Sequence, residues 1–274
     1  MAVLTFDGVG EKKFEAGVDH CVLYPQTGGA YPKGVAWNGI TGITESPEGG
    51  DAQDFYADNI KYGSLRGAEN FNGTIECYTY PDEWKGCDGR ADLADGVTFG
   101  QQSRKIFGLS YRTLIGSDAM ELGAGYILHL IYGCTASPSS KSRSTVNESP
   151  EAGTMSYEFK TTPVNVTKVA NAKATSHIEI DSTKVSSAAL AAIEAAIYGT
   201  DGSVSYSAAS PVGTENPVTE GWYERSGSAG SYVYTLSADT TVDSQKTYYI
   251  KSEVGGTDAY LPSPDQLYDL IANA

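Results

Sequence analysis

The stretch FNGTIECYTY at residues 71–80 decides the fold class of this chain. Its odd-numbered positions carry mainly apolar side chains, whereas its even-numbered positions carry polar or aromatic ones. Successive side chains of a β-strand point to opposite faces, so a period of two predicts a strand that turns one face toward a core. We therefore expect strands to dominate the fold.

Strand-like runs continue on both sides of this stretch. The other expected strands are residues 3–6, 20–24, 35–44, 55–62, 104–115, 126–132, 155–166 and 176–181. Residues 63–67 offer a hairpin connection from the fourth of these runs to residues 71–80. Residues 126–132 are nearly all apolar, which is typical of a strand covered on both faces. The segments 88–100 and 136–153 are expected to be loops.

Two helices are expected near the end of the chain. Residues 187–198 repeat apolar side chains at helical spacing. Ser186 or Ser187 can cap the start of this helix, and Gly199 stands just past its end. A smaller helix is expected over residues 264–273, where a proline suits the first turn.

The composition of the chain changes after residue 201. Residues 202–256 are rich in Ser, Gly, Thr, Tyr and Val, and they contain three further strand-like runs. We interpret them as an inserted β-rich accessory module within a larger domain made of residues 1–201 and 257–274. At roughly 55 residues, the module is near the lower size limit for a self-supporting core.

Charge and composition exclude several classes of protein. The formal net charge of −15 argues against tight binding to nucleic-acid phosphates, which requires clustered Lys and Arg. No apolar run reaches the roughly 18 residues of a membrane span, and no secretory signal is recognised, so a cytosolic origin is expected. With 40% apolar residues, the chain can bury a sizeable core.

No catalytic signature stands out in the sequence. The motifs G-x-S-x-G and H-E-x-x-H and the P-loop are absent. His20, His129 and His177 each lie in an expected strand, where a single histidine is usually structural. Asp82 and Glu83 make a poor acid/base pair because neighbouring residues of a strand face opposite sides. We expect no catalytic residues and no enzymatic activity.

No metal or cofactor site is expected either. Three aspartates precede Gly96, but their spacing does not match the EF-hand pattern. The cysteines include no C-x-x-C pair and are expected to be reduced. The three aspartates are Asp88, Asp92 and Asp95, and the four cysteines are Cys21, Cys77, Cys87 and Cys134.

Tyrosine content and local charge favour surfaces that become interfaces. The chain has 19 tyrosines and only seven phenylalanines. Tyrosine joins a large apolar ring to a hydroxyl that needs a partner, although strands favour it as well. Lys141 and Arg143 form a positive cluster in an acidic chain. The cluster is either part of a solvated loop or one half of a contact with the acidic residues 45–58 of a neighbouring copy.

Several motifs, taken in order, resemble one viral protein family. The stretches GGDAQDFYADNIKY at residues 49–62 and TIECYTYPDEW at residues 74–84 are similar to the middle of the major tail tube protein of long-tailed, siphovirus-type bacteriophages of Gram-positive hosts. Further markers are WNGI at 37–40, SYRTLIG at 110–116, LHLIYG at 128–133 and LPSPD at 261–265. The similarity covers most of residues 1–200, whereas residues 202–256 depart from the compact family pattern.

The resemblance implies a fold and an assembly. The family fold is a β-sandwich or small barrel with a flanking α-helix and a long β-hairpin, which we assign to about residues 35–80. It also implies a homo-oligomer of hexameric rings, stacked helically into a hollow tube that conducts the genome into the host. The chain would then reside in the virion tail, and in the host cytoplasm during assembly. We expect residues 202–256 on the outside of that tube.

The implied partners are also structural. They are a tape measure protein inside the tube during assembly, the tail terminator, and distal tail or baseplate proteins. DNA would pass through the lumen without specific binding, and no membrane is involved. The expected interface residues are Glu45, Glu48, Asp51, Asp54, Asp58, Tyr56, Tyr62, Tyr78, Tyr80, Lys141 and Arg143.

Two other classes of protein remain open. Another virion structural protein, such as a capsid decoration protein or an adhesin, would share the acidity and the β-rich pattern. A carbohydrate-active β-protein would instead need a cleft with two facing carboxylates, about 5–10 Å apart. The sequence offers no preferred pair of carboxylates for such a cleft.

Overall fold

The computed structural model describes residues 6–49, 52–65, 67, 69–141, 143, 145, 152–209, 216–229 and 231–274. Strands make up 47% of it and helices 12%, so the predicted mainly-β class is confirmed. The chain divides into two compact units, one formed by Met1–Gly199 with Asp258–Ala274 and the other by Thr200–Thr257. The predicted insertion at residues 202–256 lies inside the second unit.

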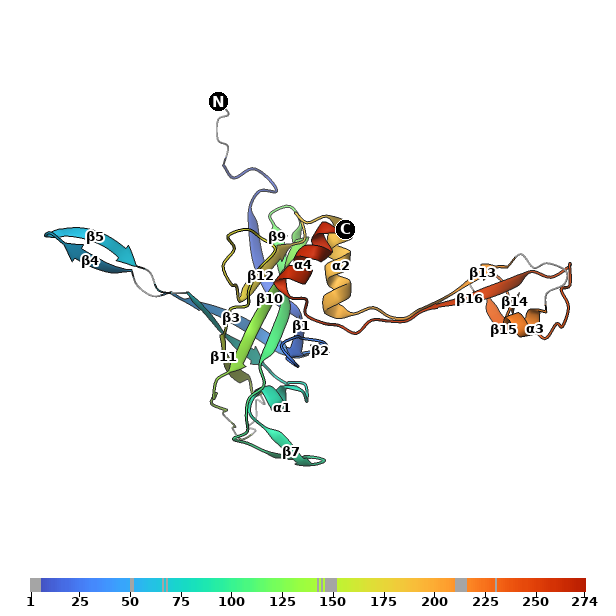
Figure 1. Ribbon diagram of the computed structural model, residues 1–274, viewed down its shortest axis with the longest axis horizontal. Coiled ribbons are helices and arrows are strands. Elements are labelled where there is room, and N and C mark those ends of the chain that lie inside the picture. Colours follow the sequence, from blue (N-terminus) through green and yellow to red (C-terminus); the bar gives the residue numbers. More distant parts are fainter. Residues whose placement is uncertain are drawn as a thin grey trace. The chain divides into compact units, whose positions relative to one another are not determined.

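An antiparallel sheet of eight strands forms the body of the first unit (Figure 1). Its strands pair in the order β2-β1-β9-β10-β11-β6-β3, and β12 pairs with β10 outside this path. The bounds are β1 Lys13–Pro25, β2 Val35–Ala36, β3 Ile40–Glu48, β6 Asn70–Cys77, β9 Phe107–Ser117, β10 Glu121–Ala136, β11 Met155–Thr161 and β12 His177–Asp181.

Two small hairpins and three helices complete this unit. Strands β4 and β5 pair with each other between β3 and β6 in the sequence, and β7 pairs with β8. The bounds are β4 Gln53–Ala57, β5 Ile60–Leu65, α1 Trp84–Cys87, β7 Ala91–Ala94, β8 Val97–Phe99, α2 Ser187–Tyr198 and α4 Pro264–Ala272.

The sheet has a hydrophobic core on each of its faces. One core gathers aromatic side chains such as Trp84, Phe107 and Phe159 from the strands and α1. The other lies between the sheet and the helices α2 and α4, which lie side by side next to β10 and β12 (Figure 1). Leu130 of β10 points to the helices and Ile131 to the aromatic core. The prediction of a strand covered on both faces is therefore confirmed.

Both predicted helices are confirmed, and their caps follow from the sequence. Ser186 accepts a hydrogen bond from the Ala189 amide at the start of α2, and Gly199 follows its last residue. Ser263 and Gln266 form a reciprocal capping box at the start of α4. The short helix α1 was not predicted.

β10 changes partners at a glycine. Its residues Ile127–Ile131 pair with β12, whereas Cys134–Ala136 pair with β11. Between these two ladders Gly133 adopts a φ of 64°, and a Cβ at this position would collide with the backbone of Thr162. Glycine is favoured here because other residues rarely adopt such a conformation. The glycine lies where one long strand changes from one pairing partner to another.

Three sequence-based assignments in this unit are wrong in detail. Residues 35–44 form two strands rather than one, because Gly39 takes a φ of 78° between β2 and β3. Residues 55–62 contain a turn at Asp58 and Asn59, so the hairpin connection is not at 63–67. Within the expected loop 88–100, residues 91–99 form the hairpin of β7 and β8.

The second unit carries its own sheet and core. Four strands pair in the order β13-β16-β14-β15, all antiparallel. Trp222, Tyr248 and Tyr249 are buried in this unit, and the rings of Tyr206 and Tyr234 stack at 3.9 Å. The bounds are β13 Ser203–Ala208, α3 Pro217–Glu220, β14 Tyr223–Ser226, β15 Val233–Leu236 and β16 Tyr248–Val254.

All four cysteines are buried and free. Within the described ranges, no helix combines the length and the apolar character needed to cross a membrane.

Candidate functional site

The β4–β5 hairpin exposes large apolar side chains. Exposed fractions are 45% for Phe55, 68% for Tyr56, 64% for Ile60, 71% for Tyr62 and 68% for Leu65. Contiguous exposed apolar surface is uncommon on monomeric proteins and marks interaction sites. The hairpin is therefore the strongest candidate for an interface on the described surface of the first unit.

The hairpin is closed by a tight turn and an ion pair. Asp58 and Asn59 take φ values of 51° and 62°, which suit the type I′ turns that connect two paired strands. Asp and Asn tolerate this left-handed conformation better than most residues, so the turn forms here rather than at the glycines of 63–67. Lys61 pairs with Asp54 at 2.7 Å. Hydrogen bonds from Lys61 and Ser64 lower the pKa of Asp54.

Backbone groups on this side of the first unit are also open to new partners. Among the described residues, β4 and β5 pair only with each other, and β3 pairs only with β6. An edge strand presents unpaired N–H and C=O groups, which another chain can complete by adding a strand. The hairpin and the free edge of β3 are thus two places where a further strand could pair.

The described part of the acidic segment 45–58 belongs mainly to two strands. Glu45 and Glu48 lie on β3, Asp54 lies on β4, and Asp58 lies in the hairpin turn. Asp51 lies outside the described residues. Successive side chains of a strand face opposite sides, so carboxylates spaced three residues apart point in different directions. Glu48, Asp54 and Asp58 are exposed, whereas Glu45 turns inward toward β10.

The other predicted interface residues divide into exposed and engaged side chains. Tyr78 and Arg143 are exposed. Tyr80 is partly buried and accepts a hydrogen bond from Arg90 at 3.0 Å. Lys141 pairs with Asp88 at 2.8 Å inside the same chain. The role of these residues in contacts between copies stays a prediction.

A second hairpin with exposed apolar side chains was not predicted. In β7 and β8, the exposed fractions are 73% for Leu93, 50% for Val97 and 41% for Phe99. A sequence signal for it exists, because Asp95 and Gly96 form an Asp-Gly pair between two short runs. Gly96 takes the positive φ that such a turn requires. The first unit therefore has two separate hairpins with exposed apolar side chains.

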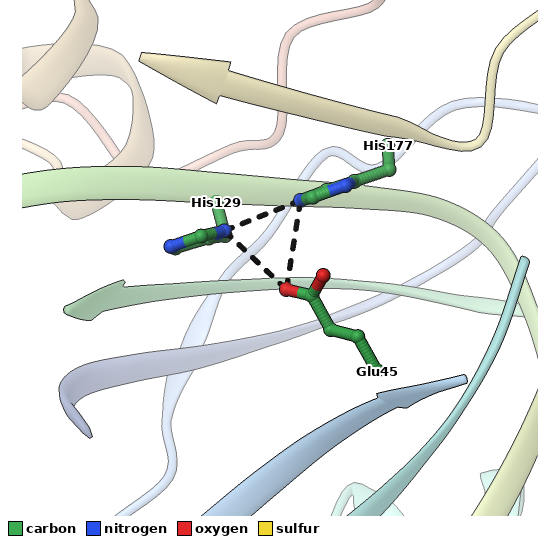
Figure 2. A group of neighbouring side chains, drawn as sticks. All are labelled: Glu45, His129 and His177. Atoms are coloured by element: carbon green, nitrogen blue, oxygen red, sulfur yellow. Dashed lines mark hydrogen bonds and ion pairs between the residues drawn. The ribbon is translucent and has the colours of Figure 1, made fainter. Parts of the chain in front are cut away.

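A compact polar cluster lies at the inner side of β3 (Figure 2). It joins Glu45 of β3, His129 of β10 and His177 of β12. His129 Nδ1 lies 3.2 Å from His177 Nε2 and 3.4 Å from Glu45 Oε1. His177 Nε2 lies 3.8 Å from the same oxygen. Sequence reasoning treated the two histidines as unrelated structural residues.

Strand register explains why these side chains meet. His177 lies opposite Ile131 in the β10–β12 ladder, so it is the diagonal neighbour of His129 on the same face. Tyr111 lies directly opposite His129 in the β9–β10 ladder, and the two rings stack at 4.6 Å. The Tyr111 hydroxyl donates a hydrogen bond to Glu45 Oε1. Four strands, β3, β9, β10 and β12, thus bring Glu45, Tyr111 and the two histidines together.

The environment favours neutral side chains at two of these positions. Burial lowers the pKa of His129; the carboxylate of Glu45 opposes this shift, and His177 adds to it. Burial and the hydrogen bond to Glu45 raise the pKa of Tyr111. At neutral pH we therefore expect a neutral imidazole and a neutral phenol beside the carboxylate.

Comparison with protein-family models and with curated proteins gives no match for this chain. The function is therefore inferred from the exposed surfaces of the chain and from its sequence motifs.

Proposed function

We propose that this chain is the structural subunit of a bacteriophage tail tube, in which hexameric rings stack into a hollow conduit for the genome. The observation that carries the proposal is the β4–β5 hairpin, a two-stranded element with exposed large apolar side chains. The hairpin overlaps the motif at residues 49–62, and the motif at 74–84 begins in β6, the next strand of the chain; both motifs resemble the tail tube family.

The physical argument starts from the stability of an isolated hairpin. Two strands alone are marginally stable in water, and three or more strands with a covered face are needed for independent stability. In the proposed ring, a neighbouring copy covers Tyr56 and Tyr62 and pairs with the open strand edges. Burying one large apolar side chain contributes roughly 1.5–3 kcal/mol, so a few such side chains per contact stabilise a ring.

Ring closure needs two different surfaces on each copy. A head-to-tail contact joins one surface of a subunit to a second, unlike surface of its neighbour, and it closes when the rotation permits. The first unit offers more than one open surface: the β4–β5 hairpin, the β7–β8 hairpin and the edge of β3. In this proposal they serve contacts within a ring and between rings.

The acidity of the chain suits a conduit. A net charge of −15 disfavours adhesion of DNA to the tube wall, because like charges repel. In this proposal the DNA passes without specific binding, and the partners are a tape measure protein, a tail terminator and distal tail or baseplate proteins. The proposal puts the unit Thr200–Thr257 on the outside of the tube.

The proposal is tested by electron microscopy and light scattering of the purified chain. We expect hollow cylinders of uniform width from the parent chain and unassembled subunits from the double variant Tyr56→Ser with Tyr62→Ser. The matched control replaces two exposed valines of the second unit, Val204→Ser with Val254→Ser, and should assemble like the parent.

Two results would count against this function. One is a parent chain that stays a single globule under all assembly conditions, as a capsid decoration protein or an adhesin would without its partner. The other is a hairpin double variant that forms cylinders as readily as the parent does.

A further inference from the structure

The Glu45, His129 and His177 cluster has the spacing of a metal site. Zinc binds histidine nitrogen at about 2.0–2.1 Å and carboxylate oxygen at about 2.0–2.2 Å, so tetrahedral ligand atoms lie roughly 3.3 Å apart. The three separations in the cluster are 3.2, 3.4 and 3.8 Å (Figure 2). Small side-chain rotations would bring all three atoms to bonding distance of one ion.

The protein fixes the tautomer that a ligand requires. Thr113 Oγ1 lies 3.0 Å from His129 Nε2 and donates a hydrogen bond to Glu15 Oε2. Because its single proton is directed at Glu15, the hydroxyl accepts the Nε2–H of His129. The Nδ1 atom of His129 then presents a lone pair to Glu45 and His177. Hydrogen bonds of this kind from the far nitrogen orient histidine ligands in metal sites.

Glu45 is oriented by its position on β3 and by a hydrogen bond. It lies two residues beyond Ile43, which packs against the aromatic core, so both side chains point inward from β3. The hydroxyl of Tyr111 donates to its Oε1. Carboxylate ligands of metal ions are themselves held by hydrogen bonds from neighbouring residues.

The cluster opens to a cavity that gives an entry path. A cavity of about 390 Å³ is lined by Glu45, Phe71, Ser176 and His177, among other residues. Ser176 is 6% exposed, and its Oγ is buried without a hydrogen-bond partner among the described residues. The cavity is therefore a polar space next to the ligand atoms.

We infer that Glu45, His129 and His177 bind one divalent transition-metal ion of the zinc class, with a fourth coordination position open to this cavity. Two imidazoles and one carboxylate suit zinc, cobalt, nickel or copper better than magnesium or calcium, which prefer oxygen ligands. The ion would link β3, from which the exposed hairpin continues in the sequence, to β10 and β12 of the sheet. The site does not depend on ring formation.

The test uses the untagged full chain in its unassembled form. Titration with Zn²⁺, monitored by calorimetry, should give one ion bound per chain. A thermal melt with Zn²⁺ should show a higher melting temperature than one without it. Titration with Co²⁺ should give visible absorption of the intensity typical of four-coordinate nitrogen and oxygen ligands. The Co²⁺ spectrum requires no substitution, so it remains informative if a variant fails to fold.

Variants assign the ion to this cluster. We expect His177→Gln and Glu45→Gln to weaken zinc binding by at least the roughly 10–100-fold that loss of an outer-shell partner costs. The matched control is His20→Gln, since His20 is the one other histidine of the chain and lies exposed on β1. It should bind zinc like the parent. Circular dichroism without metal verifies that each variant is folded.

Three results would overturn the inference. They are the absence of stoichiometric zinc binding, binding that His177→Gln leaves unchanged, and a thiolate-to-cobalt absorption band, which would assign the ion to cysteine. In each case the two histidines would form a hydrogen-bonded network without metal. Any of these results would leave the assembly proposal untouched, because the titration is done on single chains.

Discussion

The eight-stranded sheet and the β4–β5 hairpin are both antiparallel and both rich in aromatic residues, yet their side chains lie in opposite environments. In the sheet, Phe107 and Phe159 are almost completely buried between layers. In the hairpin, Tyr56 and Tyr62 are mostly exposed. The sheet is covered on both faces by its own chain, whereas the two strands of the hairpin have no other pairing partner in the described part of the chain. A high aromatic content therefore predicts a buried core only where other residues of the chain cover that face of the strands.

The largest expected contrast is between two phenylalanines. Phe107 is fully buried against Trp84, and Phe107→Ala should lower the free energy of unfolding by about 3–5 kcal/mol. Phe55 is half-exposed in the hairpin, and Phe55→Ala should change it by no more than about 0.5 kcal/mol in the unassembled chain. Urea denaturation measures both. Similar losses would show that the hairpin belongs to the folding core.

Two glycines give an intermediate contrast. A Cβ at Gly73 would lie 2.5 Å from the buried ring of Phe159 and 2.8 Å from the backbone oxygen of Thr44. Gly73→Ala should therefore cost about 1–3 kcal/mol. A Cβ at Gly63 would also lie 2.5 Å from a ring, that of Phe55, but this half-exposed ring can turn away. Equal drops in melting temperature for the two variants would contradict the contrast.

The smallest expected difference is between two ion pairs, Asp19–Arg112 and Asp54–Lys61, in how much each stabilises the fold at different pH. Asp19 accepts two hydrogen bonds from Arg112, at 2.7 and 2.8 Å, and these lower the pKa of Asp19 below its usual value of 3.8. A folded pKa below the unfolded one means that the pair stabilises the fold above pH 3.8 and that this contribution is lost as pH falls through the folded pKa. Because Asp19 is partly exposed, Asp19→Asn should cost at most about 1 kcal/mol near pH 7.

The hairpin pair of Asp54 and Lys61 is the control for this measurement. Lys61 is more exposed than Arg112, so solvent screens this pair more strongly, and Asp54→Asn should lower the melting temperature of the unassembled chain less than Asp19→Asn does at pH 7. Thermal melts at pH 7 and pH 3 compare the two variants with the parent. A larger loss for Asp54→Asn than for Asp19→Asn would reverse the comparison.

Local patterns predicted much of the body of the first unit. The alternation in residues 71–80 predicted that Ile75 and Cys77 lie in the core, and both are fully buried there. The helix over Ser187–Tyr198 followed from its apolar spacing and from the serine before it. These features depend on neighbours in the sequence, so composition and period suffice to predict them.

Long-range pairing could not be predicted in this way. Glu45, His129 and His177 are far apart in the sequence, and they meet because β12 pairs with β10 while β3 closes toward them. The two-residue turn at Asp58 and Asn59 was also missed, since glycines at residues 63–67 gave a stronger turn signal. Register between distant strands is set by the whole core, and a local period does not contain it.

The most direct test of the central claim is a structure of the assembled particle at side-chain resolution. The proposal predicts a closed ring in which Tyr56 and Tyr62 of each copy are buried against the next copy and the free edges of β3, β4 and β5 acquire partners. A particle made of a single chain, or a ring in which this hairpin stays exposed to solvent, would contradict it.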